Sequence, residues 1–479
     1  MTPGANDLCV FAVKRGIIGK RLDTHANHPK FRDVFIKLQE KYNVIALENA
    51  AERIFSGITP KAKGDAYSTD ETGILFIKSG ALSYDGSLNV DKNSRIKPEI
   101  HQGLMKSSQL KKDDILVAIV GATIGKVALF CFDYEANINQ AIAAIRLKGK
   151  GLNARFVVYY MLSDIGQTYL EYLKRPVARA NINLQEIGSI QIPLLPMEDQ
   201  NKIVERQGDI LKSCEEKRRL ANELLLHTTE YVLERLGLKI YRKANPVCYA
   251  INIKEMNERF DADYYLPRFL QFRKQIEETG FPVVFVGDIC EKINTGFAAG
   301  KQDQADDLPD DQRVAQLRPF SITSEGELSF ETKKYVPKDR LKSEDYCQKG
   351  EVIFNNTNSP DLVGKTTVFD QDVHCATSNH MTRITVKDGV NPYYVAAFFN
   401  VLLSIGYWKL LCTNFNNQAG VNIETLKKVR IPLPDINVQN EIATEIMRRR
   451  GQANQLRKEA AKEWTKAKAQ FERELLGES

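Results

Sequence analysis

The sequence predicts an α+β protein in which two tandem α/β domains are joined by two long antiparallel helices that resemble a coiled coil. Three observations lead to this prediction. The chain contains an internal sequence repeat with a period near 239 residues. Both halves show the same order of apolar and turn-rich segments, and each half ends in a long charged segment with helical spacing. A duplicated chain of this kind gives a pseudo-two-fold internal repeat.

The repeat is visible at many positions, in the same order along both halves. The matched segments lie 238 to 240 residues apart: Pro29 with Pro267, Gly125-Lys126 with Gly364-Lys365, Asn183-Leu184 with Asn422-Ile423, Ile192-Pro193-Leu194 with Ile431-Pro432-Leu433, and Gln200 with Gln439. A period this long indicates a duplicated domain rather than a solenoid. We therefore expect four segments: a first α/β domain over 1–197, a central long helix over 198–239, a second α/β domain over 240–437, and a C-terminal long helix over 438–479 that packs on the central one.

Each half begins with a short helix, predicted at Pro29–Lys41 and Pro267–Glu278. Apolar runs at Asp114–Gly121 and Glu351–Phe354 are typical of buried strands. A further helix follows each strand region, opened by Asn153 in the first half. In the second half Asn391 caps it and Pro392 suits its first turn.

The two long helices carry small and apolar residues on one heptad seam. We expect these seam residues to pack the helices antiparallel at about 20°: Ile203, Ile210, Ala221, Leu224, Ile442, Ile446, Ala453, Leu456 and Ala460. Residues 198–239 hold nine acidic and eight basic side chains, and residues 441–479 hold seven and nine. Because the chain carries a net charge of +6, most of its excess positive charge lies outside the helices, which favours a spacer and docking role for them.

Composition excludes several classes of protein. The eight cysteines and six histidines are scattered without a C-x-x-C pair, which argues against a metal site. No apolar stretch approaches the roughly 18–20 residues that span a bilayer, and the first residues lack a secretory pattern. We expect a cytoplasmic protein without a membrane partner, and the basic excess permits nucleic acid as a partner.

Two segments resemble enzyme motifs but lack the residues or the spacing that the motifs require. Gly121–Lys126 has three residues between its glycines where a phosphate-binding loop has four, and Val127 stands where Ser or Thr would hold magnesium. Asn391-Pro392-Tyr393-Tyr394 resembles the Asn-Pro-Pro-Tyr motif of adenine methyltransferases, but its third residue differs, and helix capping accounts for it. We predict no catalytic residue, no metal and no cofactor in this chain.

Three segments carry a resemblance to the specificity subunits of type I restriction–modification systems. Asp114–Val127 is similar to the central motif of their target-recognition domains. Ile192–Ile203, with its second version from Ile431 to Ile442, resembles the entry to their helical spacer, which in the family is a conserved region. Phe55–Pro60 resembles the loop after the first strand, and Asn294–Gly296 is its mate.

The resemblance implies two target-recognition domains that read a bipartite DNA sequence. It also implies that the helices set the spacing and dock two methyltransferase subunits, with motor–nuclease restriction subunits as further partners in phage defence. S-adenosylmethionine is expected in the partner methyltransferase, which methylates adenine at N6, so DNA methylation is a property of the complex. Because Gly121–Ile124 and Thr357–Pro360 would line the groove differently, we predict an asymmetric target.

Polar and basic side chains in the turn-rich regions are the candidates for DNA contact, because such groups bind base edges and phosphates. In the first domain they are Ser56, Thr59, Lys61, Lys63, Lys78, Thr123, Lys126 and Arg179. In the second domain they are Asn294, Thr295, Lys301, Asn355, Asn356, Thr357, Lys365, Asn416, Asn417 and Gln418.

Three alternatives stay open at this point. The chain could be a stand-alone modification or nuclease enzyme, which the missing motifs oppose. It could be a protein scaffold in which the helices are the functional part, or a specificity-like DNA-reading subunit of another phage-defence modification system.

Overall fold

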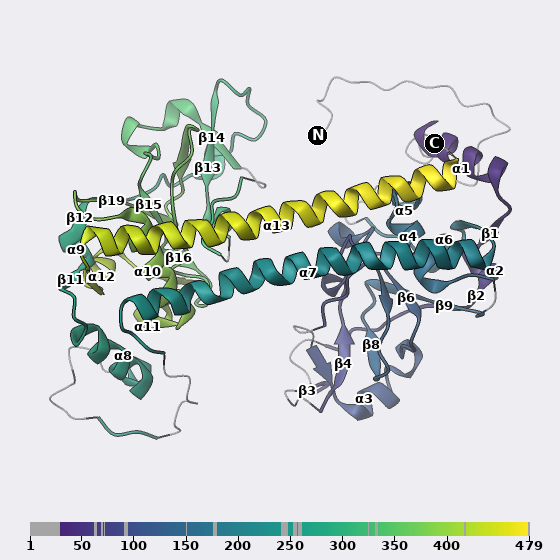
Figure 1. The fold of residues 1–479 in the computed structure, drawn as a ribbon, viewed down its shortest axis with the longest axis horizontal. Coiled ribbons are helices and arrows are strands. Elements are labelled where there is room, and N and C mark those ends of the chain that lie inside the picture. Colours follow the sequence, from purple (N-terminus) through teal and green to yellow (C-terminus); the bar gives the residue numbers. More distant parts are fainter. Residues whose placement is uncertain are drawn as a thin grey trace. The chain divides into compact units, whose positions relative to one another are not determined.

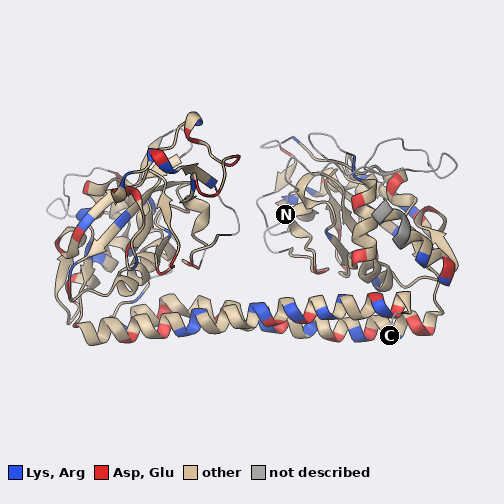
Figure 2. Ribbon diagram, turned by 90° about the horizontal axis from the view of Figure 1, so that it is seen from above, with Lys and Arg blue, Asp and Glu red and all other residues tan. Residues whose placement is uncertain are grey.

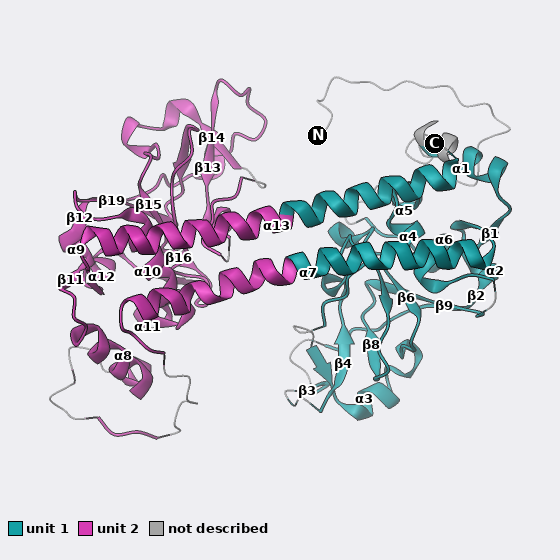
Figure 3. Cartoon of the chain, in the orientation of Figure 1, with its two compact units in different colours: residues 1–217, 458–479 teal, residues 218–457 magenta. Residues whose placement is uncertain are grey.

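The chain forms two compact units that share a pair of long helices (Figure 1). The structure is a computed structural model that describes residues 29–61, 65–68, 70, 72–90, 94–149, 151–175, 180–240, 248–251, 256, 261–323, 325–330, 334–415 and 418–477. Residues 1–217 and 458–479 belong to the first unit and residues 218–457 to the second (Figure 3). The helices α7 (Met197–Arg235) and α13 (Ile436–Leu476) therefore give one segment to each unit.

The first unit combines two four-stranded sheets with helices. In its described residues the strand orders are β2-β9-β6-β7, which is antiparallel throughout, and β3-β5-β4-β8, in which β4 and β8 run parallel; β1 pairs with β10. The strands are β1 (Val44–Ala46), β2 (Ala51–Ser56), β3 (Tyr67–Ser68), β4 (Ile74–Ile77), β5 (Ser94–Ile96), β6 (Asp114–Ala118), β7 (Val127–Phe130), β8 (Ala136–Ile138), β9 (Ile142–Leu147) and β10 (Gln191–Pro193). The helices besides α7 are α1 (Pro29–Lys41), α2 (Leu47–Ala50), α3 (Pro98–Gln102), α4 (Ala154–Leu162), α5 (Asp164–Leu173) and α6 (Leu184–Gly188).

The apolar run of β6 is buried on both faces, and this explains why it lacks polar alternation. Ile115 and Val117 pack into a core that includes α4, α5 and the long helices. Leu116 and Ala118 point the other way, toward β4 and β8. The β2-β9-β6-β7 sheet is thus the middle layer of the first unit.

The second unit repeats this plan with local changes. Among its described residues the main sheet has the order β12-β19-β15-β17, and three smaller sheets have the orders β14-β13-β18, β16-β21-β20 and β11-β22. The strands are β11 (Val283–Phe285), β12 (Cys290–Thr295), β13 (Arg313–Leu317), β14 (Lys334–Pro337), β15 (Val352–Asn355), β16 (Thr357–Asn358), β17 (Thr366–Val368), β18 (Cys375–Thr377), β19 (Met381–Val386), β20 (Thr413–Phe415), β21 (Gln418–Gly420) and β22 (Arg430–Pro432). The helices besides α13 are α8 (Pro267–Glu277), α9 (Val286–Ile289), α10 (Pro392–Ser404), α11 (Tyr407–Leu411) and α12 (Ile423–Lys427).

A buried carboxylate–arginine pair recurs in the two main sheets. Asp114 of β6 is fully buried and accepts two hydrogen bonds from Arg146 of β9, at 2.8 and 2.7 Å. Glu351 and Arg383 take these places in the second unit, with 3.7 Å between the charged groups. A buried charge needs such a partner, so the pair ties neighbouring strands in each unit.

The predicted helix caps are confirmed. Asn153 accepts a hydrogen bond from the backbone N–H of Arg155 at 2.9 Å at the start of α4. Asn391 accepts one from Tyr393 at 2.8 Å, and Pro392 is the first residue of α10.

One buried glutamine in the first turn of each long helix anchors that helix to its unit. The Gln200 side-chain oxygen accepts from the Asn153 N–H at 2.8 Å, while its amide nitrogen donates to the carbonyls of Gly151 and Leu195 at 3.0 and 2.8 Å. Gln439 binds Asn391 N–H and the Pro434 carbonyl in the same way, both at 2.8 Å. The two glutamines are 0% and 1% exposed, so the repeated glutamine seen in the sequence is structural.

The long helices pack antiparallel within each unit, which confirms the predicted fold class. In the first unit Gln207 donates to the Ala467 carbonyl at 3.2 Å, and in the second Arg449 donates to the His227 carbonyl at 2.8 Å. The predicted seam residues Ile203, Ala221, Ile442, Ile446, Ala453 and Ala460 are buried, whereas Ile210, Leu224 and Leu456 are half-buried. The observed helices, Met197–Arg235 and Ile436–Leu476, overlap the predicted segments 198–239 and 438–479 and differ from them by a few residues at the ends.

Within the described part of the chain, no helix has the length and apolar character that crossing a bilayer requires.

Candidate nucleic-acid interface

In the first unit, one group of predicted DNA-contacting residues lies on the loop that leaves β2. Ser56 is the last residue of β2, and the loop that follows it carries Thr59 and Lys61, which are both exposed. It crosses the end of β8 at Gly57, where an added Cβ would lie 1.7 Å from the carbonyl oxygen of Ile138. Only glycine permits this approach, and the loop is thereby held against the sheet with its polar side chains outward.

The second unit builds the same crossing at Gly296. An added Cβ there would lie 2.2 Å from the Thr377 carbonyl oxygen, at the end of β18. The N–H of the next residue, Phe297, donates to that carbonyl at 2.8 Å. Asn294 and Thr295 precede the glycine, and Thr295 is exposed. The two loops are therefore closer mates in structure than their sequences suggested.

A basic residue stands next to each crossing. Lys78 directly follows β4, and the parallel partner strand β8 ends at the same edge of the sheet. There the N–H of Asn139, the residue after β8, donates to the Ile77 carbonyl at 3.1 Å. Lys78 is exposed, and its ammonium donates to Ser94 Oγ at 2.7 Å. Arg318 follows β13 in the same way, and its Nε donates to Gln316 Oε1 at 3.1 Å.

Sequence reasoning missed Arg318. The signal was present, because Arg318 lies 240 residues after Lys78, within the range of the other repeat offsets. Each unit thus presents a polar loop and a basic side chain at the ends of matching strands.

Thr123 and Lys126 form a second group in the first unit. Thr123 ends a short 3-10 turn, and its hydroxyl donates to the Val120 carbonyl at 2.9 Å. The Lys126 ammonium lies 5.6 Å from the centre of the Tyr84 ring. Tyr84 is 51% exposed and donates to the Ala122 carbonyl at 3.1 Å, so a tyrosine that the sequence did not single out joins this group.

Three predicted contacts in the second unit need correction. Asn355, Asn356 and Lys365 are 0%, 6% and 8% exposed. Asn355 donates to the Leu362 carbonyl at 3.1 Å, and Asn356 donates to Thr382 Oγ1 at 2.9 Å. The Lys365 ammonium donates to the carbonyls of Pro319 and Ile322, and burial lowers its pKa.

These side chains are used inside the domain, so the expectation of direct base contact is withdrawn for all three. Their type alone could not reveal this, because asparagine and lysine are usually exposed.

A small sheet replaces the corresponding segment of the first unit. Thr357 lies in β16, which pairs with β21, and β21 pairs with β20. Asn414 and Gln418 are exposed on this ribbon, while Thr357 is half-buried. Amide side chains on a narrow ribbon suit the major groove and can pair with adenine.

Five predicted DNA-contacting residues remain, and the structure describes only Lys301 among them. Lys301 is exposed in a short 3-10 turn. Lys63, Arg179, Asn416 and Asn417 lie outside the described residues.

Charge along the long helices is balanced by pairing. In Figure 2 the basic positions (blue) and the acidic positions (red) are interspersed along the ribbon of the long helices. Lys217 pairs with Glu463 and Arg206 with Glu474 in the first unit, and Arg235 pairs with Glu441 in the second. Paired charges of both signs do not make a phosphate-binding surface, in agreement with the even charge counts of these helices.

The helix pair of the second unit carries an apolar groove of about 800 Å³. Leu220, Leu224 and Leu456 line it, together with polar side chains that include His227 and Gln452. Leu226, in the same turns of α7, is 67% exposed. Exposed leucines on a rigid helix pair are typical of a protein-binding surface.

The chain is similar to known DNA specificity proteins. The family model described as "Type I restriction modification DNA specificity domain" matches residues 53–225 and 278–463. The EcoBI specificity subunit of Escherichia coli, a type I restriction enzyme component, is 29% identical over 192 residues, which are 39% of this chain and 40% of that protein. The putative type I restriction enzyme MjaX specificity subunit of Methanocaldococcus jannaschii is 24% identical over 162 residues, 33% of this chain and 36% of that protein. The aligned parts thus span well under half of these relatives.

Among solved structures, the chain is matched to the type I restriction–modification system S subunit from M. genitalium. It is 11% identical, and the match covers 91% of this chain and 95% of that one. Its TM-score of 0.42 is too low for the likeness to bear on the fold.

Proposed function

Because this chain belongs to the family of type I restriction modification DNA specificity domains, we propose that it is the sequence-specific DNA-binding subunit of a type I restriction–modification complex. In this proposal the two units read the two halves of a bipartite target. The observation that carries it is the matched pair of glycine crossings at Gly57 and Gly296, each presenting a polar loop beside a basic side chain. Lys78 and Arg318 would bind phosphates, and the loops would reach base edges.

The two surfaces are built alike but carry unlike side chains, which supports an asymmetric target. The first unit offers the Tyr84–Lys126 group, whereas the second offers the amide-bearing ribbon with Asn414 and Gln418. Recovering bound duplexes from a random library tests this directly. We expect two short specified blocks of different sequence, separated by an unspecified spacer. Recovery of a palindrome or of one block would contradict the proposal.

Phosphate contact is tested separately by salt dependence. Affinity for a selected duplex should fall linearly with salt on a log–log scale, with a slope of about −0.9 per neutralised phosphate. Lys78→Ala and Arg318→Ala should each reduce the slope by about one. Lys202→Ala, on α7 and paired with Glu198 at 2.6 Å, is a control that should leave it unchanged. A slope near zero for the unaltered chain would favour a protein scaffold instead.

We propose further that the chain is not catalytic by itself and acts in the cytoplasm. The partner methyltransferase would bring S-adenosylmethionine and methylate adenine at N6, and restriction subunits would join the same complex. The groove lined by Leu220, Leu224 and Leu456 supports a docking role for the helix pair. Incubating the isolated chain with DNA and labelled S-adenosylmethionine should transfer no methyl group, and transfer by this chain alone would overturn the assignment.

The docking surface has its own test. Leu220→Lys, at a position that lines the groove and is 39% exposed, should weaken assembly with the methyltransferase while leaving DNA affinity unchanged. Unchanged assembly would remove this groove from the docking surface.

A further inference from the structure

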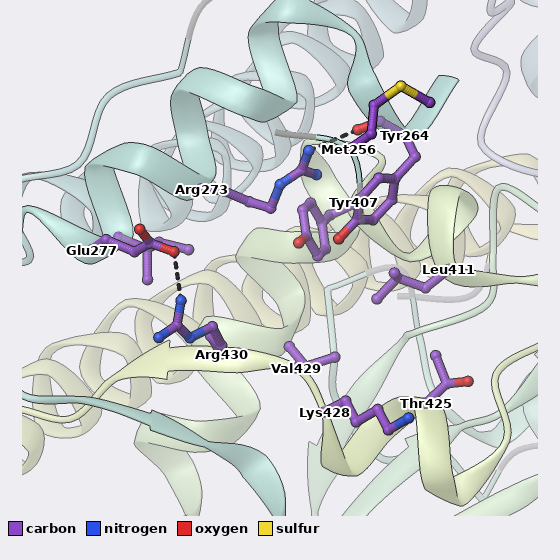
Figure 4. A pocket seen from close by; sticks show the side chains of 11 residues that line it. Met256, Tyr264, Arg273, Glu277, Tyr407, Leu411, Thr425, Lys428, Val429 and Arg430 are labelled. Atoms are coloured by element: carbon purple, nitrogen blue, oxygen red, sulfur yellow. Dashed lines mark hydrogen bonds and ion pairs between the residues drawn. The ribbon is translucent and has the colours of Figure 1, made fainter. Parts of the chain in front are cut away.

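The second unit contains a charged pocket. The pocket has a volume of about 750 Å³ and lies between α8, α11 and the segment that joins α12 to β22 (Figure 4). These elements are different from the loops and ribbon of the candidate nucleic-acid interface. A cavity of this size is within the range that holds a small molecule.

The pocket combines a basic wall with an aromatic and apolar one. Figure 4 shows Arg273 and Arg430 on facing sides, with Glu277 joined to Arg430 by an ion pair. Lys428, at another edge, is exposed. Among the described residues that line the cavity, three basic groups and one acidic group give a net charge of +2. The rings of Tyr264 and Tyr407 and the side chains of Leu411 and Val429 line the rest.

Arg273 has hydrogen-bonding capacity that the described contacts do not use. Its guanidinium lies 4.1 Å from the centre of the Tyr264 ring, and Nη2 donates to the Tyr264 carbonyl at 2.9 Å. Nη1 is buried and has no hydrogen-bond partner among the residues that the structure describes. A buried donor without a partner is costly, and an anion bound beside it would remove that cost.

The internal repeat shows that the fold does not need these charges. At the matching positions of the first unit, Arg273 is replaced by Phe35, Glu277 by Gln39, Lys428 by Ser189 and Arg430 by Gln191. Phe35 of α1 stacks on Tyr169 of α5 with 3.7 Å between ring centres. The same helical arrangement therefore forms there with an aromatic side chain where the second unit has Arg273. All four charged residues belong to the pocket rather than to the shared fold.

We propose that this pocket binds a small anion that carries a flat aromatic ring, with a nucleoside monophosphate as the simplest biological example. The anionic group would be held by Arg273 and Lys428, with Arg430 adding to the positive field. The ring would lie against Tyr264 and Tyr407 over the apolar floor. This site goes beyond DNA reading and would give the second unit a ligand of its own.

Calorimetric titration of the full chain with AMP, adenosine and inorganic phosphate tests both halves of the proposal. We expect one AMP to bind per chain, and adenosine and phosphate each to bind at least about tenfold more weakly. Failure of AMP to bind at millimolar concentration would overturn the proposal. Phosphate binding as tightly as AMP would overturn the aromatic part, and adenosine binding as tightly would overturn the anionic part.

Variants taken from the first unit locate the site. Arg273→Phe and Arg430→Gln install residues that the repeated fold already accepts, and each should weaken AMP binding by about tenfold or more. Lys428→Ser should weaken it less, because this side chain is exposed. Gln39→Ala, at the exposed first-unit position that matches Glu277, is the control and should change nothing. AMP binding that survives Arg273→Phe and Arg430→Gln unchanged would place the ligand elsewhere and overturn the proposal.

DNA binding provides an independent readout for these variants. Arg273→Phe should retain the DNA affinity and the salt slope of the unaltered chain. Loss of AMP binding with intact DNA binding would support the pocket. Loss of both together would show that AMP had occupied the DNA-binding surface, which would also overturn the proposal.

Discussion

Replacing the buried glutamine of a long helix should release that helix from its own unit and leave the other unit intact. Gln439→Leu keeps the size of the side chain but removes its hydrogen bonds. The Asn391 N–H and the Pro434 carbonyl, each 2.8 Å from the Gln439 side chain, would then be left unpaired in a place where Gln439 is 1% exposed. Each unpaired buried group costs about 1–3 kcal/mol, so we expect the second unit to lose on the order of 3 kcal/mol.

The two tryptophans of the chain allow each unit to be followed separately. Trp408 is buried in the second unit and Trp464 in the first. Urea unfolding of Gln439→Leu, made in a Trp464→Phe background, reports the second unit through Trp408 fluorescence. Gln200→Leu in a Trp408→Phe background is the reciprocal experiment. Separate probes are needed because a chain of two units is not expected to unfold in a single two-state step.

The control for this experiment is the exposed neighbour of the glutamine. Asn440 accepts a hydrogen bond from the Asn391 amide at 2.7 Å at the surface, so Asn440→Ala should cost less than about 1 kcal/mol. A loss for Gln439→Leu as small as that of Asn440→Ala would refute the anchoring role. An equal loss in both units would refute the assignment of one glutamine to each.

Three other perturbations have equally defined outcomes. Asp114→Ala leaves the Arg146 guanidinium without its buried partner and should destabilise the first unit by about 3–5 kcal/mol, measured by urea unfolding followed at Trp464. Gly296→Ala pushes a Cβ against the Thr377 carbonyl and should weaken DNA binding through the second block of the target only, measured with duplexes mismatched in one block at a time. Glu445, whose pKa is lowered to about 2 by hydrogen bonds from Arg448 and Arg449, should stabilise the second unit above pH 4.5 and lose that contribution as the pH falls toward 2, so the stability difference from Glu445→Gln should vanish there.

The fold could be predicted from the sequence because the same pattern of helices and strands can be recognised independently in both halves of the repeat. The start of α1 at Pro29, the capping roles of Asn153 and Asn391, and both long helices follow from local rules that each half satisfies independently. The apolar run of β6 was recognisable because both of its faces are buried.

The candidate interface was less predictable because residue type does not reveal burial. Asn355 and Lys365 look like surface residues, yet backbone carbonyls inside the domain bind their side chains. Arg318 was overlooked because its neighbours in the sequence resemble those of Lys78 poorly. The repeat offset of 240 residues suggests that the two basic residues are equivalent, and the strand register confirms it, because Leu317 lies beside Thr377 as Ile77 lies beside Ile138.

The differences between the units are as informative as their likeness. Arg450 of α13 is half-buried in the second unit, and its guanidinium donates to the Glu325 carbonyl at 2.9 Å. The next turn adds a hydrogen bond from Asn454 to the Glu327 carboxylate at 2.8 Å. The matching position in α7 is Leu211, which has no polar group to offer. The second unit therefore fixes a loop of its sheet region to its long helix by directional contacts, and the first unit has an apolar side chain at the position of Arg450. The second unit has these hydrogen bonds at Arg450 and the charged pocket at Arg273, where the matching residues of the first unit are Leu211 and Phe35. Unlike side chains at matching positions are what divergence toward two different tasks produces, because the shared fold forms without these charges.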